Sequence, residues 1–192
     1  MHKNITKKNY IIKNENKITI TIFGLFLLGI SIFLFLSFSS FLFYWKKDQS
    51  QLIIFDKEII AENLLGKIGA IASHYFIHCG IGISAFFIPV LLFFTGIKIL
   101  LAKKNILDNF YKSIIYKFIF FSIWIPITCH LILPDKNYKG IFSGIFGFEI
   151  GNFLINLFGK IGLFILIVIS ISLYYIIFLR IRKVTIKKKY NS

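Results

Sequence analysis

Acidic side chains are scarce in this sequence, and their scarcity excludes several kinds of chemistry. Only 8 of the 192 residues are Asp or Glu, against 23 Lys and Arg, which gives a formal net charge of +15. No two carboxylates are placed as a general acid and base, and no Ser, His and acid form a candidate triad. None of the acids falls at the centre of a long apolar segment, where transporters and channels carry their ionisable groups. The sequence therefore gives no indication of an active site.

A phosphate-binding loop is also missing from the two stretches that most resemble one. "LLGKIG" at 64–69 and "LFGKIG" at 157–162 both contain Gly-Lys. A Walker A loop needs an earlier glycine and a Ser or Thr after the lysine. The earlier glycine is absent from both, and Ile68 and Ile161 stand at the hydroxyl position. We expect neither stretch to hold a nucleotide.

Apolar residues, in contrast, dominate the chain. They make up 57% of it, aromatic residues make up 18%, Phe alone occurs 24 times, and there are only 3 prolines. The mean hydropathy is +0.77. A chain of this composition cannot cover its apolar groups with polar surface in water, so its solvent is expected to be a lipid bilayer.

Four segments are long and apolar enough to cross a bilayer, which takes about 20 residues each. The first is not a signal peptide, because its apolar stretch is too long and no small-residue cleavage site follows. We therefore predict an all-α, polytopic membrane protein. Its membrane domain is expected at residues 18–179, with spans at about 18–44, 81–101, 114–133 and 161–179.

Basic residues gather at one side of these expected spans. They fill the tail 1–17, the short loop between the second and third spans, and the tail 180–192. By the positive-inside rule both termini are cytoplasmic, as in a multi-pass protein of a bacterial inner membrane. The last residues, "RIRKVTIKKKYNS", would bind DNA or anionic lipid only electrostatically and without sequence preference. Sequence-specific DNA binding is not expected.

The two segments on the outer side are more than simple loops. Residues 58–78 have apolar positions at helical spacing and are predicted to form an interfacial helix, with a bend at Gly80 and Gly82 before the second span. Residues 140–158 are apolar and rich in glycine. They are expected to be either a second interfacial helix or a re-entrant stretch.

The recurring Gly-Lys-Ile-Gly element lies in both outer segments and suggests a duplicated helical hairpin, 18–101 and 114–179. The glycines would allow close backbone approach, and each lysine would reach the lipid headgroups. The alternative is that Gly-x-x-Gly recurs by chance in apolar sequence. The candidate interaction residues in the two elements are Gly66, Lys67, Gly69, Gly159, Lys160 and Gly162.

Five residues near the outer ends of the second and third spans could bind a metal. His74, His78 and Cys79 lie on one segment, and Cys129 and His130 on the next. Such residues can bind zinc or copper, and Cys79 and Cys129 could also form a disulfide in an oxidising compartment. Interfacial His and buried Cys are more often packing residues. We favour that interpretation and expect no metal or other cofactor.

Several blocks in order resemble one known family. They are "SFLFYWKKDQS" (40–50), "ENLLGKIGAIASHYF" (62–76), "GIGISAFFIPVLLFFTGIKIL" (80–100) and the later "LFGKIG". Together they resemble the amino-terminal four-helix membrane domain of FtsK/SpoIIIE-type DNA translocases, most closely the version found in Bacteroidetes. The resemblance covers about residues 18–180. It adds Trp45, Asp48, Gln49 and His74 to the candidate interaction residues.

This resemblance implies a membrane anchor at the division septum. In that family the domain holds a hexameric, ATP-driven DNA pump at the division site and contacts other division proteins, which links it to chromosome segregation. This sequence has no Walker A, Walker B or DNA-reading winged helix, so we expect no enzymatic activity from it. A motor would act in trans, or the chain would keep only the division role. The alternative function is a small four-helix transporter or channel subunit.

Overall fold

The structure is a computed structural model that describes residues 2–49, 61–101, 104–133 and 140–190. All of its regular elements in these ranges are helices, which confirms the predicted all-α fold. In chain order they are α1 (His2–Gln49), α2 (Gly66–Ser73), the π-helix η1 (His74–Ile81), the 3-10 helix η2 (Gly82–Phe86), α3 (Phe87–Leu101), α4 (Lys104–Ile132) and α6 (Gly144–Tyr190).

Four helical stretches are long and apolar enough to cross a membrane. They are Lys17–Trp45, Gly66–Leu101, Tyr111–Ile132 and Gly144–Phe178. The second and fourth are 36 and 35 residues long, more than a straight crossing needs, because each includes a short helix that runs across one end of the molecule. The predicted number of membrane-crossing helices is thus confirmed.

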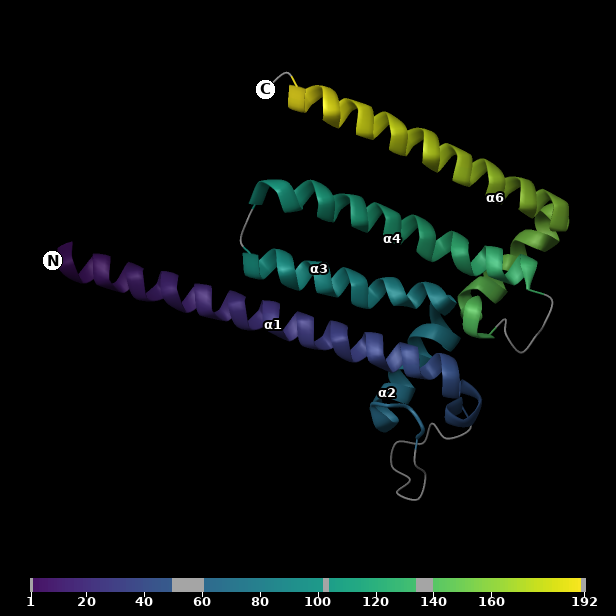
Figure 1. Cartoon of the computed structure of the whole chain (residues 1–192), viewed down its shortest axis with the longest axis horizontal. Coiled ribbons are helices and arrows are strands. Elements are labelled where there is room, and N and C mark those ends of the chain that lie inside the picture. The colour runs from purple at the N-terminus through teal and green to yellow at the C-terminus, as the bar shows by residue number, and fades with distance from the viewer. Residues whose placement is uncertain (1, 50–60, 102–103, 134–139, 191–192) are drawn as a thin grey trace.

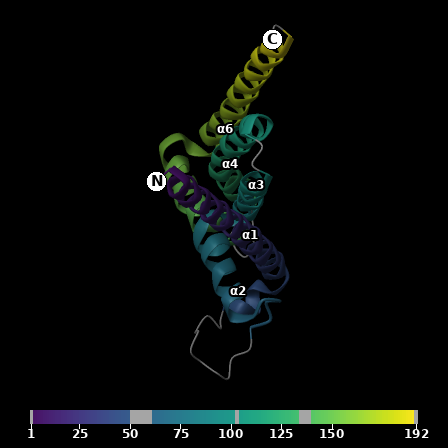
Figure 2. The same cartoon turned by 90° about the vertical axis from the view of Figure 1, so that its left-hand side faces the viewer.

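The spanning helices lie side by side in a row (Figure 1), in the order α1, α3, α4, α6. α1 packs against α3, α3 against α4, and α4 against α6. The view turned by 90° shows the same order, with α6 at the opposite edge from α1 (Figure 2). This order follows the chain, since consecutive spans are neighbours in the row, as successive elements usually are. The result is two hairpins, α1 with α3 and α4 with α6.

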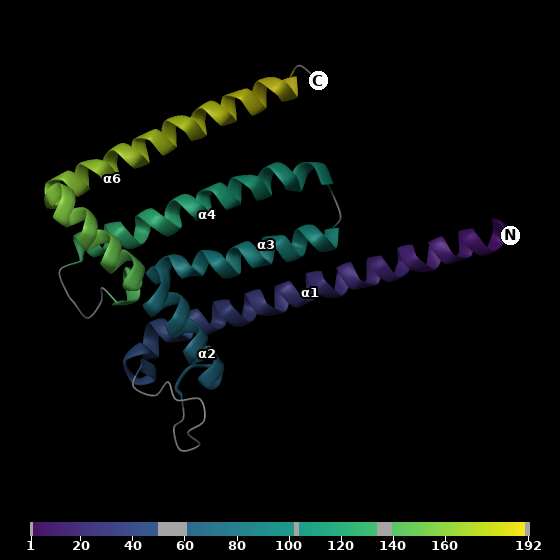
Figure 3. The ribbon, with the colours of Figure 1, turned by 180° about the vertical axis from the view of Figure 1, so that it is seen from behind.

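Both termini lie at one end of the row, and α2 and the first part of α6 lie at the other (Figures 1 and 3). We call the end away from the termini the distal end. α1 is 48 residues long, and the part of α6 that follows its break at Gly159 continues to Tyr190. At 1.5 Å per residue these helices are about 70 Å and about 45 Å long, against about 30 Å of bilayer hydrocarbon. Residues 2–16 and 180–190, which the sequence suggested as basic tails, therefore continue the helices of the first and fourth spans.

Buried apolar side chains form two small clusters. In the first, Leu34, Phe38 and Phe41 of α1 pack with Ile77 of the first hairpin and with Ile141 from the segment before α6. A second cluster joins Ile127 of α4 to Leu163 and Ile167 of α6. Much of the remaining apolar surface is exposed, which suits helices whose sides face lipid.

Small residues let α1 and α3 approach closely within the first hairpin. A Cβ on Gly96 of α3 would lie 2.9 Å from the carbonyl oxygen of Gly24 in α1. Further along, the Ser31 hydroxyl donates a hydrogen bond of 2.7 Å to the carbonyl of Pro89. Close backbone contact and a serine bond are the usual means by which helices associate where water is absent.

The segment expected to be an interfacial helix at 58–78 begins its helix at Gly66, and residues 58–60 lie outside the described part. Residues 61–65 instead form a turn, in which the Gly66 amide donates to the carbonyl of Asn63 at 2.8 Å. The Asn63 side chain also accepts a bond from the Leu65 amide at 3.1 Å. An asparagine that bonds its own backbone in this way favours a turn over a helix.

Candidate functional site

Two short helices cross the distal end, and both begin and end at glycines with left-handed backbone angles. The first distal helix is the run of α2 and η1 over residues 66–81. The second distal helix is the first part of α6, residues 144–158. Their bounding glycines are Gly66 and Gly82, with φ of 64° and 60°, and Gly144 and Gly159, with φ of 60° and 71°. Other residues are strained at these angles, so the glycines decide where each distal helix starts and where the chain turns into the next span.

The first distal helix packs on α1 through small residues at the third and seventh positions after its first glycine. These are Gly69 and Ser73, both buried. A Cβ on Gly69 would clash with the Asn63 side chain and would lie 3.1 Å from the Ser37 hydroxyl of α1. The distal helix therefore rests directly on the helix that leads up to it.

Buried polar side chains hold this contact. The Ser37 hydroxyl donates to the Gly69 carbonyl at 2.6 Å and lies 2.7 Å from the Ser73 hydroxyl. The Asn63 side-chain amide donates to the Ser37 carbonyl at 3.0 Å. The Ser40 hydroxyl accepts the Leu64 amide at 2.9 Å. Because buried polar groups are costly when they lack partners, this network fixes one arrangement of the turn on α1.

The second distal helix repeats the same pattern on α4. Its third and seventh positions after Gly144 are Gly147 and Gly151. A Cβ on Gly147 would lie 2.6 Å from the carbonyl oxygen of Pro126, and one on Gly151 would clash with the ring of His130 at 2.5 Å. The Nε2 atom of His130, itself buried, lies 3.0 Å from the side-chain oxygen of Asn152. Each distal helix thus packs through small residues on the span before it.

The two distal segments touch each other backbone to backbone. A Cβ on Gly82 would clash with the carbonyl group of Phe142, and one on Gly144 would clash with the Gly80 carbonyl and lie 2.5 Å from the Gly82 amide nitrogen. The contact is reciprocal, since each glycine leaves room for the backbone of the other segment. We call this contact the glycine crossing; it joins the two hairpins at the distal end.

The structure does not place the two Gly-Lys-Ile-Gly elements at equivalent positions. Gly66 and Gly69 open the first distal helix, whereas Gly159 closes the second and Lys160 and Gly162 begin the span that follows. By position at the start and the end of each distal helix, Gly66 corresponds to Gly144, and Gly82 corresponds to Gly159. The two distal helices therefore share a pattern of glycines, in a different register from the one the sequence element suggests, and the hairpin duplication stays a prediction.

The other predicted interaction residues are scattered over the distal end. Trp45 packs against the core of the first hairpin. Asp48 and Gln49 are the last residues of α1, and their side chains lie outside the described part. Lys67 is partly buried near the start of the first distal helix, and Lys160 is exposed.

Of the five candidate metal ligands, the structure brings three together. His74, His78 and Cys79 form one group on η1, and neither Cys129 nor His130 belongs to it. His74 also packs its ring edge to face against Phe41 of α1. Cys79 is exposed and Cys129 partly buried, and both are free thiols in this structure.

Sequence reasoning missed the polar residues that hold the first distal helix, chiefly Asn63, Ser37 and Ser73. A signal for Ser37 was present, because it shares a helical face with Leu34, Phe38 and Phe41, and all four are buried. A polar residue on the apolar face of a spanning helix indicates a partner on another segment. Asn63 carried no comparable signal, since it lies in a turn.

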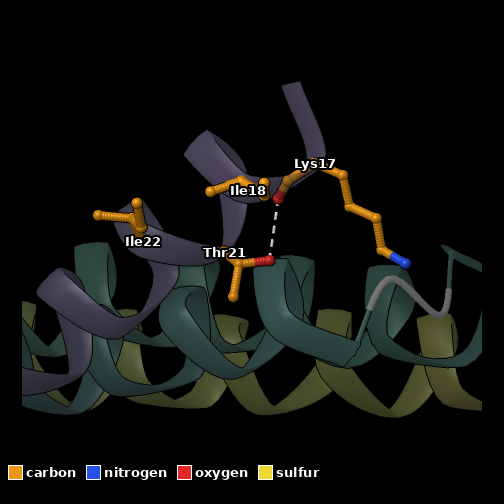
Figure 4. Close-up of a pocket in the computed structure, with 4 residues that line it drawn as sticks. All are labelled: Lys17, Ile18, Thr21 and Ile22. Atoms are coloured by element: carbon orange, nitrogen blue, oxygen red, sulfur yellow. Dashed lines mark hydrogen bonds between the residues drawn. The ribbon is translucent and has the colours of Figure 1, made fainter. Parts of the chain in front are cut away.

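The surface depression at the start of the first span offers no chemistry of its own. It is lined by Lys17, Ile18, Thr21 and Ile22, all exposed (Figure 4). The Thr21 hydroxyl donates to the Lys17 carbonyl at 2.9 Å, so it is engaged by the helix backbone. A second groove, between α1 and α3, is lined mostly by apolar residues. Both features suit a helix that enters lipid.

These observations define the class of the protein as a multi-pass helical membrane protein, with four spanning helices and two helices across one end. No curated protein and no solved structure matches the chain. A family model does match, over residues 16–190, and it describes the 4TM region of the DNA translocase FtsK/SpoIIIE. The chain belongs to this family.

Proposed function

We propose that this chain anchors an FtsK-type system in the bacterial inner membrane and recruits it to the division site. The family match over residues 16–190 carries the proposal, because that region is the membrane part of the translocase. It supports an anchoring role and gives no support to ATP hydrolysis by these residues. Under this proposal a motor that moves DNA acts together with the anchor, whether on the same polypeptide or in trans.

The positive-inside rule supports a cytoplasmic position for both termini. Lys17 begins the first span, Lys98 lies in the last turn of α3, and Lys112 and Lys117 lie in the first half of α4. The end of α3 and the start of α4 lie at the end of the row that holds the termini (Figure 1). Lys98 lies 4.5 Å from the centre of the Tyr111 ring, and Lys117 lies 5.2 Å from that of Phe178. Ammonium groups stacked on aromatic rings suit the headgroup level of a membrane. The distal end then faces the outer compartment.

The first distal helix has the surface of a helix that lies on a bilayer or binds a partner there. Leu64, in the turn before this helix, and Ile68 and Tyr75, on the helix itself, are 74%, 70% and 69% exposed. Exposed apolar side chains of this kind bury themselves in the interface or in another protein. We propose that these side chains contact division proteins.

The single row of spans supports assembly into a homo-oligomer. The row has two broad faces (Figure 2). The described spans also leave many of their apolar side chains exposed. Lipid covers such faces at no hydrophobic cost, so packing between copies would depend on shape and on small residues rather than on escape from water. Partner spans on these faces would give a symmetric assembly.

A localisation experiment tests the proposal. A fluorescent fusion of the whole chain is expected to gather at the division septum. The double variant Ile68→Ser, Tyr75→Ser should stay in the membrane but lose septal enrichment. A matched double variant on a lipid-facing side of α6, Ile165→Ser and Ile169→Ser, should keep it. Uniform envelope fluorescence of the unchanged fusion would contradict the division-site role and would favour a transporter or channel subunit.

A further inference from the structure

The first distal helix carries a cluster of metal-ligating side chains that anchoring does not use. His74, His78 and Cys79 each offer one ligand atom, and these three atoms lie within 4.8 Å of one another. Donors that share a tetrahedral zinc ion lie about 3.3–3.8 Å apart, since zinc–nitrogen and zinc–sulfur bonds are about 2.0–2.3 Å long. Small rotations of the side chains would therefore bring the three atoms onto a common ion.

The local backbone produces this arrangement. Residues 74–81 form a π-helix, a rare form that is often found at functional sites. In it the rings of His74 and His78 are stacked, with centres 4.8 Å apart and planes 12° from parallel. Gly80, directly after Cys79, leaves helical geometry with φ −94° and ψ −130°. The helix thus breaks at the cluster, which places Cys79 beside the histidines and leaves it exposed.

The surroundings of the cluster resemble a prepared site rather than ordinary packing. The Nδ1 atom of His74 is buried and has no hydrogen-bond partner within the described ranges. A buried ring nitrogen without a partner is costly, and a metal ion is one way to satisfy it. Nε2 of His78 faces the helical residues 140–142 that precede the second distal helix, since a Cβ on Gly140 would lie 3.0 Å from it. The cluster therefore lies where the two hairpins meet, next to the glycine crossing.

We propose that His74, His78 and Cys79 bind one Zn²⁺ ion at the distal end. Two imidazole nitrogens and a thiolate are borderline-soft donors of the kind that zinc accepts, with a water molecule or an outside ligand in the fourth position. Cys79 binds as the thiolate, so its thiol proton is released to solvent on binding. The ion would hold the three side chains of η1 together where the helix breaks at Gly80, and so stabilise this part of the distal end.

Direct metal titration of the full chain tests this site. The protein is purified in detergent without a polyhistidine tag, stripped with a chelator, and titrated with Zn²⁺ against a chromophoric competitor. The unchanged protein is expected to bind one equivalent. Cys79→Ser and His74→Gln should each weaken binding at least tenfold, whereas Cys129→Ser, the same substitution at the other cysteine, should not change it. Cobalt in place of zinc should give a thiolate charge-transfer band, lost only in Cys79→Ser.

Three outcomes would overturn the proposal: no zinc bound by the unchanged protein, equal loss in Cys79→Ser and Cys129→Ser, or binding of Cu⁺ with no measurable binding of Zn²⁺. Thermal unfolding of the stripped proteins shows whether each variant is folded. If His74→Gln is not folded, Cys79→Ser still decides the matter, because an exposed cysteine tolerates serine. A folded Cys79→Ser that binds zinc as tightly as the unchanged protein refutes the site.

Discussion

Asn63 does more at the distal end than its place in a turn suggests. Its side-chain amide bonds the Ser37 carbonyl of α1, and its side-chain oxygen accepts the Leu65 amide. One buried residue therefore shapes the turn and attaches it to the first span. An asparagine with both ends of its side chain engaged cannot be replaced without loss, since each alternative leaves a buried polar group unpaired.

Replacing this residue should be costly for stability. Asn63→Ala removes both bonds and leaves the buried Ser37 carbonyl without this donor, so the free energy of unfolding should fall by about 1–3 kcal/mol. Unfolding in mixed micelles with a graded denaturing detergent measures the change. Asn156→Ala is the matched control, because Asn156 is exposed on the second distal helix, and it should alter stability by less than about 0.5 kcal/mol. Equal effects of the two substitutions would show that the Asn63 bonds contribute nothing.

Some glycines in this chain allow close packing and others allow a left-handed backbone angle, and alanine substitutions can distinguish the two roles. Gly69→Ala should destabilise by about 1–3 kcal/mol, because the new Cβ meets Asn63 and Leu65. Gly66→Ala meets no atom within 4 Å but has φ of +64°, so it should lose only about 1 kcal/mol through backbone strain. Gly29→Ala, in open space on α1, should be neutral or stabilising. The same detergent unfolding ranks the three variants, and a Gly29→Ala loss as large as that of Gly69→Ala would contradict this account.

At the scale of elements, the distal helices show which features the sequence could predict. Hydropathy locates the spans because the bilayer demands long apolar runs, whatever the details of packing. The repeated Gly-Lys-Ile-Gly element suggested a duplication. In the structure, however, its two copies lie at different positions, one at the start of a distal helix and one at the end. The correspondence of Gly66 with Gly144 rests on their place at the start of each distal helix and on small residues at the next two contact positions. Those positions are filled by Gly or Ser, so the amino-acid sequences of the two distal helices differ although both helices pack through small residues.

The glycine crossing should behave as one unit under mutation. Gly82→Ala and Gly144→Ala each combine a strained φ with a clash against the other segment, whereas Gly159→Ala has a similar φ and nothing within 4 Å. Each of the first two should therefore destabilise by about 1–3 kcal/mol more than Gly159→Ala. The double variant Gly82→Ala, Gly144→Ala should lose less than the sum of its parts, because both changes open the same contact. Strict additivity would mean that the two glycines do not share a contact.

For the whole molecule, the arrangement of charge and helices predicts which end faces outside. In a background with Cys79→Ser and Cys129→Ser, the Glu62→Cys variant should react with a membrane-impermeant maleimide in intact cells. The Lys112→Cys variant should react only after the membrane is permeabilised. Both positions are exposed, so access and not burial decides the result. Labelling of Lys112→Cys from outside would reverse the proposed orientation.

The row of four spans illustrates what sequence reasoning could not supply. Alternating topology follows from four apolar segments and their flanking charges. The order of packing, and the joining of the hairpins at a backbone contact, depends on interactions between residues such as Gly82 and Phe142, which are far apart in the chain. No local sequence pattern predicts a contact between two residues that are so far apart in the chain. The candidate metal cluster was different, because its three residues are near neighbours in sequence.

The continuation of α1 and α6 past the bilayer has a consequence for anything fused to either end. A helix turns about 100° and rises 1.5 Å with each residue. An unbroken helix therefore fixes both the distance of an attached domain along the helix axis and its rotation about that axis. Inserting two residues near Lys183 would swing an attached domain to nearly the opposite side while moving it only about 3 Å. Inserting seven residues would rotate the attached domain by almost two full turns and so return it nearly to its original orientation. The helix therefore fixes the orientation of a fused domain relative to the membrane region, in addition to its distance from the membrane.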